Sequence, residues 1–379
     1  MNEDKLYDVA IIGGGLAGLS LSIQCVKAGY KTILFEKEKY PFHKVCGEYI
    51  SFESWNFLEE LGVPLSQMNL PAIRRLLVSA PNGKELEQDL PLGGFGISRY
   101  TLDGMLAEIA KQNGVEVIEE TKVTDARFEN ERFTIQCSTF NVRSKIAAGT
   151  FGKRSNLDVR WKRRFAFQKA NKLNNYIGIK YHIKTNWPRD LIALHNFKNG
   201  YCGISQIEDD KFCLCYLTTA KNLERCDHSI PQMEKQILCQ NPYLKEIFAE
   251  SEMLYKTPVT ISQISFAKKF QIENHMLMIG DAAGMITPLC GNGMSMALHG
   301  SKMAFEQIHL FLLHKIPRRQ MEENYTANWQ KQFGKRLKTG RLIQQFFGST
   351  FLSNLLIIVL KPFPLITSKW ISQTHGQLF

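Results

Sequence analysis

The sequence predicts an α/β protein in which an antiparallel sheet is inserted into a domain built on parallel strands. Two apolar segments, residues 7–12 and 31–35, flank a helical segment that Gly29 ends, which is the order of a β-α-β unit. Short alternating strands joined by turn residues then fill residues 177–217. Near residue 278 another apolar strand leads into a helix, so the α/β pattern returns late in the chain.

Composition bounds the class of protein. The 379 residues are 44% hydrophobic and 22% charged, which suits two globular domains or one large one. The net charge of +11 permits phosphate-rich or membrane partners. Neither zinc-finger spacing nor an aromatic RNA-binding motif occurs, so we expect no nucleic-acid partner. The nine cysteines are an odd number and are scattered along the chain, so we expect reduced thiols. The polar N-terminus does not resemble a signal peptide, so we expect a cytoplasmic location.

A glycine-rich loop joins the first predicted strand to the first helix. It reads Gly13-Gly14-Gly15-Leu16-Ala17-Gly18. In a β-α-β unit Gly13 permits the tight turn, Gly15 lets the backbone approach a pyrophosphate, and Gly18 lets helix and strand pack closely. We therefore predict a dinucleotide site, with Leu16 and Ala17 at the helix start that faces the phosphates.

An acidic residue follows at the end of the second strand. Glu36 comes 18 residues after Gly18, where a carboxylate can accept hydrogen bonds from ribose hydroxyls. Lys37 lies beside it and is included among the candidate cofactor contacts. Because an acid at this position disfavours a 2'-phosphate, NAD or FAD is preferred over NADP here.

A second candidate site lies late in the chain. The apolar residues 276–279 end at Gly280-Asp281, and a helix starts near Ser295 after a turn rich in glycine and proline. The N–H groups that precede this helix form a donor cluster at its positive end, suited to an electron-rich group. They belong to Gly291, Asn292, Gly293 and Met294. Asp281 alone could equally be a helix N-cap.

Two further motifs suggest a family. Residues 44–48 read Lys-Val-Cys-Gly-Glu, and residues 97–103 read Ile-Ser-Arg-Tyr-Thr-Leu-Asp. Together with the glycine loop and Gly280-Asp281, they resemble the FAD-dependent oxidoreductases that include geranylgeranyl reductases, aromatic-ring hydroxylases (group A flavoprotein monooxygenases) and flavin halogenases. Over about residues 5–340 the resemblance implies a Rossmann-like FAD-binding domain of the glutathione-reductase type. It also implies an inserted antiparallel-sheet substrate domain and a helical C-terminus.

The resemblance also implies roles for individual residues. It places Cys46 and Gly47 near the flavin ring, with Cys46 the candidate catalytic side chain beside the flavin itself, and it turns Arg99 toward the cofactor. It makes Asp281 an acceptor for the ribityl chain. A buried structural thiol and a surface arginine at a helix entry are the alternatives for Cys46 and Arg99.

Two distant motifs that serve one FAD imply a discontinuous domain. We predict that residues 1–70, 95–160 and 267–315 form the FAD-binding domain. Residues 71–94 and 161–266 form the substrate domain, and residues 316–379 a helical C-terminal segment. The strands at 123–128, 133–137 and 142–147 should complete the nucleotide-binding sheet with an antiparallel addition. The turn Pro81-Asn82-Gly83 predicts a hairpin.

Three segments are candidates for contact with a ligand or a membrane. A basic run is expected to be a solvated face, with a phosphate or membrane surface as the alternative; it comprises Lys153, Arg154, Arg160, Lys162, Arg163, Arg164, Lys169 and Lys172. Cys213 and Cys215 share a strand face, but a lone C-x-C is a poor metal site, and we expect no metal. The basic and apolar residues 316–379 suit either peripheral contact with an anionic membrane at its inner face or a helix pair closing the substrate domain.

These features predict an FAD-dependent oxidoreductase acting on a hydrophobic small molecule held between the flavin and the sheet near residues 202–205. The preferred reaction is reduction of carbon-carbon double bonds in an isoprenoid or quinone-like lipid, with NAD(P)H or another reductant as transient electron donor. Residues 146–155 lack the Ala-Asp-Gly stretch of ring hydroxylases. Hydroxylation of an aromatic or polyketide substrate with NAD(P)H and O2 remains the alternative, and a non-catalytic flavin-binding protein is a third. The W-x-W-x-I-P signature of halogenases is missing. The oligomeric state stays open.

Overall fold

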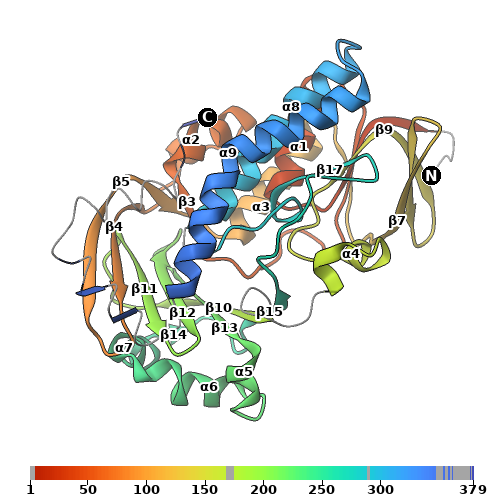
Figure 1. Cartoon of the computed structure of the whole chain (residues 1–379). Helices are drawn as coiled ribbons and strands as arrows, with labels where there is room; N and C mark the ends of the chain where they lie inside the picture. The colour runs from red at the N-terminus through yellow and green to blue at the C-terminus, as the bar shows by residue number, and fades with distance from the viewer. Residues whose placement is uncertain are drawn as a thin grey trace.

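The structure is a computed structural model, which describes residues 5–167, 175–287 and 291–346 and the positions 353–354, 357–358, 361, 376 and 378–379. Within these residues an eight-stranded and a nine-stranded sheet are joined by helices (Figure 1). The eight-stranded sheet has the order β16-β17-β9-β1-β2-β6, with β7 and β8 attached to β9. The nine-stranded sheet runs β14-β10-β13-β12-β11-β4-β5-β3, with β15 beside β10. The predicted α/β class is confirmed.

The first β-α-β unit is the centre of the eight-stranded sheet. Strand β1 pairs in parallel with β2 on one side and β9 on the other, and β17 adds in parallel to β9. The bounds are β1 Leu6–Ile12, α1 Leu16–Lys27, β2 Thr32–Phe35, β6 Glu116–Ile118, β9 Asn141–Gly149 and β17 Met276–Met278. Parallel strands end at the same sheet edge, so the loops after β1, β2 and β17 meet there.

The antiparallel addition to this sheet is confirmed. Strands β7 (Val123–Glu129) and β8 (Arg132–Cys137) form a hairpin whose second strand pairs with β9. The two-residue strand β16 (Ile272–Glu273), which the sequence did not predict, pairs antiparallel with β17. The short helix α4 (Asn156–Arg160) was also missed, although Ser155 and Asp158 form a capping box at its start.

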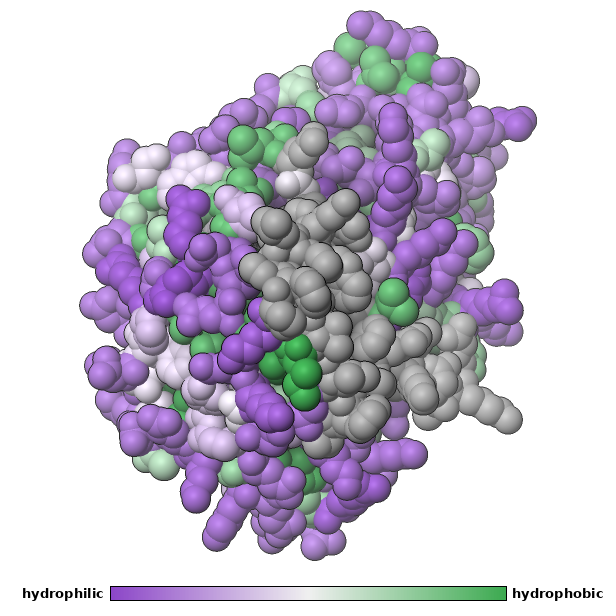
Figure 2. All heavy atoms as spheres, turned by 60° about the vertical axis from the view of Figure 1, so that its left-hand side comes forward, coloured by the Kyte–Doolittle hydropathy of each residue, from purple (hydrophilic) through white to green (hydrophobic). Residues whose placement is uncertain are grey.

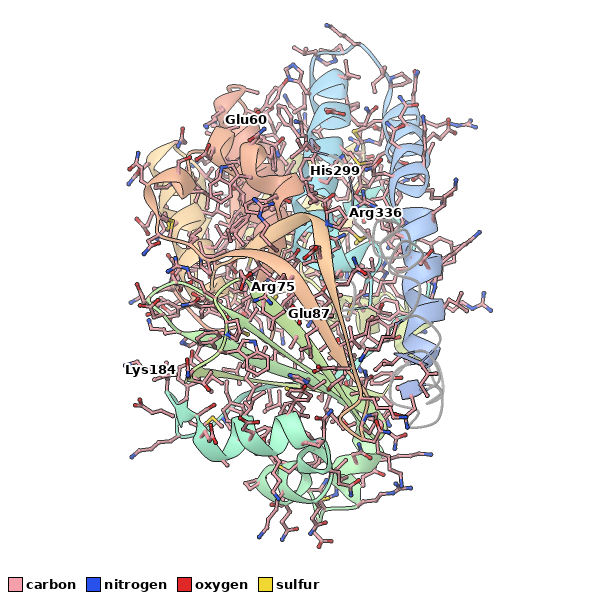
Figure 3. The ribbon with its side chains drawn as sticks, turned by 90° about the vertical axis from the view of Figure 1, so that its left-hand side faces the viewer. Glu60, Arg75, Glu87, Lys184, His299 and Arg336 are labelled. Carbon is pink, nitrogen blue, oxygen red and sulfur yellow. The ribbon has the colours of Figure 1, made fainter. Side chains whose placement is uncertain are left out.

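The nine-stranded sheet contains the predicted hairpin and the alternating strands. Its bounds are β3 Tyr49–Ser51, β4 Ala72–Ser79, β5 Glu85–Gly96, β10 Tyr176–Lys184, β11 Leu191–Phe197, β12 Gly200–Gln206, β13 Phe212–Thr219, β14 Glu252–Met253 and β15 Val259–Ile264. Across the hairpin Arg75 Nη1 contacts Glu87 Oε1 at 2.6 Å (Figure 3). The predicted antiparallel pairing is confirmed for β10, β11, β12 and β13. The parallel pairing of β11 with β4 was not predicted. Strand β3, expected as a loop, pairs with the end of β5, which runs on past the predicted hairpin.

Three helices cover the outer face of the nine-stranded sheet, at the bottom of Figure 1. They are α5 (Ala220–Glu224), α6 (Ile230–Gln236) and α7 (Pro242–Glu250). Asn241 caps α7 by accepting a hydrogen bond from the Tyr243 N–H, and proline follows at the first helical position. Met233, Leu244 and Ile247 of these helices are buried against the sheet. The opposite face of the sheet therefore remains to form a cavity wall.

The long helices α8 (Gly293–Leu312) and α9 (Arg318–Phe346) lie side by side, and α9 runs from the top right of Figure 1 down to its centre. Helix α8 packs on α1, and α9 packs on α8. The buried face of α9 is formed by Met321, Tyr325, Trp329, Phe333 and Leu337. Tyr325 Oη donates to the Met278 carbonyl at 2.7 Å, which fixes the end of β17. The remaining helices are α2 (Trp55–Leu61) and α3 (Arg99–Gln112), with 3-10 turns at Phe52–Ser54, Leu65–Gln67, Arg164–Phe167, Leu238–Gln240 and Gly280–Ala282.

The membrane expectation for the C-terminal segment is only partly covered by the described residues. Its apolar stretches fall mainly between residues 347 and 375, nearly all outside the described part of the chain. Among the described helices, none combines the length and apolar character needed to span a bilayer. On the face drawn in Figure 2, the described surface is mostly hydrophilic, with hydrophobic side chains in small separate groups.

The basic run departs from a solvated face at two positions. Arg163 is buried, and its guanidinium contacts Asp158 and Glu273, each at 2.8 Å. Lys153 is half-buried and turns toward the interior. Arg154, Arg160, Lys162 and Arg164 are exposed as predicted, while Lys169 and Lys172 lie outside the described residues.

Candidate active site

The glycine loop combines two tightly packed glycines with an open one. Gly13 has φ of 108°, and a Cβ there would lie 2.7 Å from the Thr150 carbonyl oxygen. A Cβ on Gly18 would lie 2.1 Å from the Gly13 carbonyl oxygen. At Gly15, by contrast, a Cβ would meet no atom closer than 3.6 Å. The fold therefore requires Gly13 and Gly18, whereas Gly15 leaves free space at the N-terminus of α1, next to Leu16 and Ala17.

The acid after β2 holds this loop. Glu36 is buried, and its Oε2 accepts a hydrogen bond of 2.9 Å from the Gly14 N–H. Tyr40 Oη donates to the Gly14 carbonyl at 2.6 Å, a contact that the sequence did not suggest. The Lys37 side chain is 67% exposed and pairs with Glu38, so the structure does not bring it to the loop. The structure thus brings Glu36 but not Lys37 to the glycine loop, and the ribose contact of Glu36 stays a prediction.

Two cations converge over Gly15. Arg99 forms a bidentate pair with Asp103, with both distances 2.7 Å, and Lys44 Nζ contacts the same carboxylate at 2.9 Å. Burial raises the pKa of Asp103, but Arg99 and Lys44 outweigh it and hold that pKa below its usual range. The Arg99 and Lys44 nitrogens lie 3.6 and 3.9 Å from the Cβ position of Gly15. Cations here suit a pyrophosphate, and Lys44 is a candidate that we missed although it opens the Lys-Val-Cys-Gly-Glu motif.

The late motif faces the same space. Gly280 has φ of 64°, and its Cβ position lies 3.3 Å from the Ala17 side chain of α1. Asp281 follows in a 3-10 turn and lines a cavity with Gly291, Gly293 and Met294. Asn292 is buried at the N-cap position of α8. The structure therefore joins Gly280–Asp281 and the start of α8 to the glycine loop, from which they are far in sequence.

A cavity of about 220 Å³ lies between these motifs and the inner face of the nine-stranded sheet. The glycine loop and the Gly280-Asp281 motif, which we call the FAD-type motifs, both contribute to it, as do Cys46 and Gly47. The sheet contributes mainly apolar and small residues, namely Ile192, Leu194, Tyr201, Gly203, Ile204, Ser205, Cys215, Tyr216 and Leu217. Of the segment predicted to hold substrate, Gly203 to Ser205 line the cavity, whereas Cys202 packs in the core on the helical side of the sheet.

A buried lysine braces the cavity floor. Lys269 Nζ donates to the backbone carbonyls of Lys153 and Asp281, each at 2.8 Å. Lys153 Nζ in turn donates to the Val45 carbonyl at 3.3 Å, next to Cys46. Burial lowers the pKa of Lys269 to about 8. Sequence reasoning missed Lys269, because nothing in a local pattern connects it to residues on two other loops.

A second buried group of charges surrounds Glu48. Its Oε1 accepts hydrogen bonds from Lys180 Nζ at 2.7 Å and from the Arg99 N–H at 2.8 Å. Its Oε2 lies 2.5 Å from His182 Nε2. Burial raises the pKa of Glu48, but the hydrogen bond and charge of His182 and the charge of Lys180 outweigh it, so that pKa lies below its usual value. Glu48 also has a left-handed backbone, with φ of 54°, and it lines the cavity.

This cluster is an ion-pair network. Potential ligand atoms of Glu48, His182 and Cys213 lie within 4.8 Å of one another. However, the Lys180 ammonium already supplies the positive charge beside Glu48. The Cys213 thiol donates to the Cys46 carbonyl at 3.2 Å, and burial raises its pKa well above its usual value, so it is not the thiolate that binds metals. Cys213 and Cys215 do share a sheet face, and Cys215 lines the cavity.

The residues present fit FAD. Gly15 offers backbone without a side chain at a helix N-terminus, two cations face it, and an acid stands beside it. A model of the FAD binding domain matches residues 6–312. The chain belongs to this family. It is an FAD-dependent oxidoreductase, and its FAD-type motifs and cavity are therefore parts of an enzyme.

Curated relatives cover most of the chain. The conditioned medium factor receptor 1 of Dictyostelium discoideum is 25% identical over 358 residues, which is 88% of this chain and 69% of that protein. The digeranylgeranylglycerophospholipid reductase of Methanococcus vannielii is 22% identical over 359 residues, 88% of this chain and 84% of that enzyme.

Solved structures share the fold. A geranylgeranyl bacteriochlorophyll reductase-like protein from Thermoplasma acidophilum aligns with a TM-score of 0.79 at 18% identity, covering 99% of this chain and 97% of its own. A flavin-dependent brominase aligns with a TM-score of 0.78 at 19% identity, covering 99% and 94%. At these identities the likeness describes the fold, and the individual site residues stay predictions.

Proposed function

We propose that this oxidoreductase reduces carbon-carbon double bonds in an isoprenoid or quinone-like lipid. The observation that carries the proposal is the apolar sheet wall that faces both FAD motifs across one cavity. Ile192, Leu194 and Leu217 present aliphatic side chains to it, and Gly203 leaves space between them. Such a wall binds an unsaturated hydrocarbon chain by removing apolar surface from water.

Two further observations support the reductase reaction. The Lys-Val-Cys-Gly-Glu segment, which resembles a segment of the reductase-like members of the family, lies on the cavity wall through Val45 to Glu48. A curated relative over most of the chain is a digeranylgeranylglycerophospholipid reductase.

Each part of the cavity has its own role in the proposed reaction. When bound, FAD supplies two electrons as hydride after reduction by a nicotinamide nucleotide or another donor. Gly15, Arg99 and Lys44 would hold its pyrophosphate, and Glu36 would hold its ribose. Asp281 and the N–H groups at the start of α8 would face the flavin portion. The sheet wall orients the lipid and excludes water.

Anaerobic turnover tests the proposal. Purified protein reduced under argon with NADPH, NADH or dithionite is mixed with geranylgeraniol or a menaquinone. We expect reoxidation of the yellow cofactor and a lipid product that has gained two hydrogens per double bond by mass spectrometry. Absence of hydrogenated product with every donor contradicts the proposal. Hydroxylated product formed only after air is admitted assigns the chain to the monooxygenases.

A cavity variant sharpens the test. A Cβ on Gly203 meets only atoms at 3.6 Å or beyond, so Gly203→Leu projects its side chain into the cavity without a backbone clash. We expect Gly203→Leu to retain FAD and to lose lipid reduction by at least about 10-fold. Gly334→Leu, on α9 where a Cβ meets nothing within 4 Å, is the matched control and should keep wild-type turnover.

A further inference from the structure

A cation on the cavity wall has no acidic partner. Lys153 is half-buried and lines the cavity. Its Nζ donates to the Val45 carbonyl at 3.3 Å, and among the residues that the structure describes its ammonium forms no ion pair. An ammonium has more than one N–H donor, so Lys153 keeps donors for a ligand in the cavity.

The other charged side chains of the cavity wall already have a partner or a predicted role. Arg99 and Glu48 each form an ion pair with an oppositely charged side chain. Asp281 is the predicted acceptor for the ribityl chain. Within the described part of the wall, Lys153 is therefore the cation whose charge the protein does not balance. A partly buried charge of this kind favours a ligand that brings negative charge to it.

Hydrogen bonds place Lys153 between the two sides of the cavity. Its carbonyl accepts from the same buried ammonium as the Asp281 carbonyl, each at 2.8 Å, which ties it to the late FAD-type motif. The loop that accepts its side chain is tied to the sheet, because Ser205 Oγ donates to the Gly47 carbonyl at 3.4 Å. Burial raises the pKa of Cys215 on the sheet wall to about 12, and the charge of Lys153 opposes that rise. The ammonium thus acts on the space between the flavin side and the sheet.

We propose that Lys153 binds a carbonyl oxygen of the lipid, so that the double bond reduced is one conjugated with that carbonyl. The inference rests on the proposed function and narrows its substrate class to α,β-unsaturated carbonyl lipids, such as an isoprenoid aldehyde or a quinone. Lys153 keeps its proton throughout and acts as a hydrogen-bond donor to the oxygen.

The reaction balances as a conjugate reduction. The β-carbon takes hydride from reduced FAD, which leaves FAD oxidised for its nicotinamide donor to restore. The π electrons of the double bond move toward the carbonyl, and negative charge develops on its oxygen as an enolate. The α-carbon then takes a proton from solvent, and the carbonyl forms again. The charge that Lys153 stabilises therefore exists mainly in the transition state and in the enolate.

Binding of a phenolate tests the site without turnover. Pentafluorophenol is ionised at neutral pH and carries its charge on an oxygen of an unsaturated system, as an enolate does. Pentafluoroaniline has nearly the same size and is uncharged. The affinity of oxidised holoenzyme for each is measured by calorimetry. We expect the preference for the phenolate to fall at least about 10-fold in Lys153→Met. An equal preference in wild type and variant overturns the proposal.

Turnover of a matched pair of lipids is the second arm. Geranylgeranial has a double bond conjugated with its aldehyde, whereas geranylgeraniol has an alcohol in place of the aldehyde. We expect Lys153→Met to lower kcat for anaerobic reduction of geranylgeranial about 100-fold, the usual cost of losing a donor to a developing oxyanion. KM should change much less, and Lys153→Arg should restore most of the rate. Any reduction of geranylgeraniol should be as fast in Lys153→Met as in wild type.

The neighbouring residue provides the control. Arg154 is exposed and does not line the cavity. Arg154→Met removes the same formal charge as Lys153→Met, so it should keep the wild-type phenolate preference and the wild-type rate with geranylgeranial. FAD affinity should be the same in both variants and in wild type, which shows that each variant is folded.

The two arms separate the possible failures. If wild type reduces a double bond but Lys153→Met slows both lipids alike or neither of them, the carbonyl contact is overturned and the proposed function stands. A lowered flavin reduction potential together with equal slowing assigns Lys153 to the flavin instead. If wild type hydrogenates neither lipid nor a menaquinone with any donor, the proposed function fails, and the inference fails with it.

Discussion

The two walls of the cavity are built in different ways. The nucleotide wall, which is the glycine loop with Glu36, is formed mainly by neighbouring backbone groups. Gly13, Gly15 and Gly18 lie within one loop, and Glu36 accepts a hydrogen bond from an N–H of that loop. On the sheet wall, side chains from separate segments meet, as Glu48 does with Lys180 and His182. The first wall tolerates no added volume at Gly13 and Gly18 but leaves open space at Gly15, whereas the second depends on the balance of buried charges.

This difference predicts that the walls fail in different ways. A substitution on the sheet wall that unbalances charge should reduce the stability of the fold. A substitution on the nucleotide wall should affect either the fold or the cofactor, depending on whether the added atom meets protein or open space. Three predictions test this distinction.

The largest expected effect is on the sheet wall. Lys180→Met removes the cation from a pair in which both side chains are 0% exposed. An uncompensated buried carboxylate costs roughly 3–5 kcal/mol of unfolding free energy, measured by urea denaturation. Glu87→Gln is the control, since its pair with Arg75 has side chains 46% and 36% exposed (Figure 3). It should cost less than about 1 kcal/mol. Equal losses of unfolding free energy in the two variants would contradict the view that the sheet wall depends on the buried Lys180–Glu48 pair.

The second prediction separates two glycines of the nucleotide wall. Gly15→Ala should fold normally, because Gly15 has φ of −87° and an open Cβ position, but its methyl group occupies the space needed by the pyrophosphate. We expect FAD affinity to fall about 100-fold, roughly 2.7 kcal/mol, measured by flavin fluorescence titration. Gly18→Ala should instead destabilise the apoprotein, because its Cβ lies 2.1 Å from the Gly13 carbonyl. Wild-type FAD affinity in the Gly15→Ala variant would refute the pyrophosphate placement.

The third prediction concerns Lys269, which braces the floor between the walls. Its folded pKa of about 8 lies below the usual lysine value of about 10.4. Between these pH values the unfolded chain holds a proton that the folded chain has released, so stability rises with pH by about 1.4 kcal/mol per unit. Lys269→Met should lack this component when unfolding is measured from pH 8 to pH 10. If the unfolding free energies of wild type and variant changed with pH in parallel, the lowered pKa of Lys269 would be ruled out.

The sequence could predict the nucleotide wall because its determinants are local. The strand, glycine spacing, helix and acid of residues 7–36 were visible as one pattern, and Gly280-Asp281 was recognisable by resemblance. The charge cluster was not predictable, because Lys180 and His182 look like ordinary alternating strand residues until β10 is placed beside the Cys46 loop. Likewise, the parallel pairing of β4 with β11 depends on a contact between distant segments that no local periodicity encodes.

The connection between β2 and β3 has a thermodynamic consequence. Residues 36–48 leave the eight-stranded sheet after β2 and enter the nine-stranded sheet at β3, which pairs with β5. Glu48, at the end of this connection, is hydrogen-bonded to β10 and to the start of α3. A cavity ligand that displaced β10 would therefore move Cys46 and Arg99 as well. Cofactor and ligand affinities would then be coupled, and by linkage a ligand that tightened FAD binding would itself be held more tightly by the same factor.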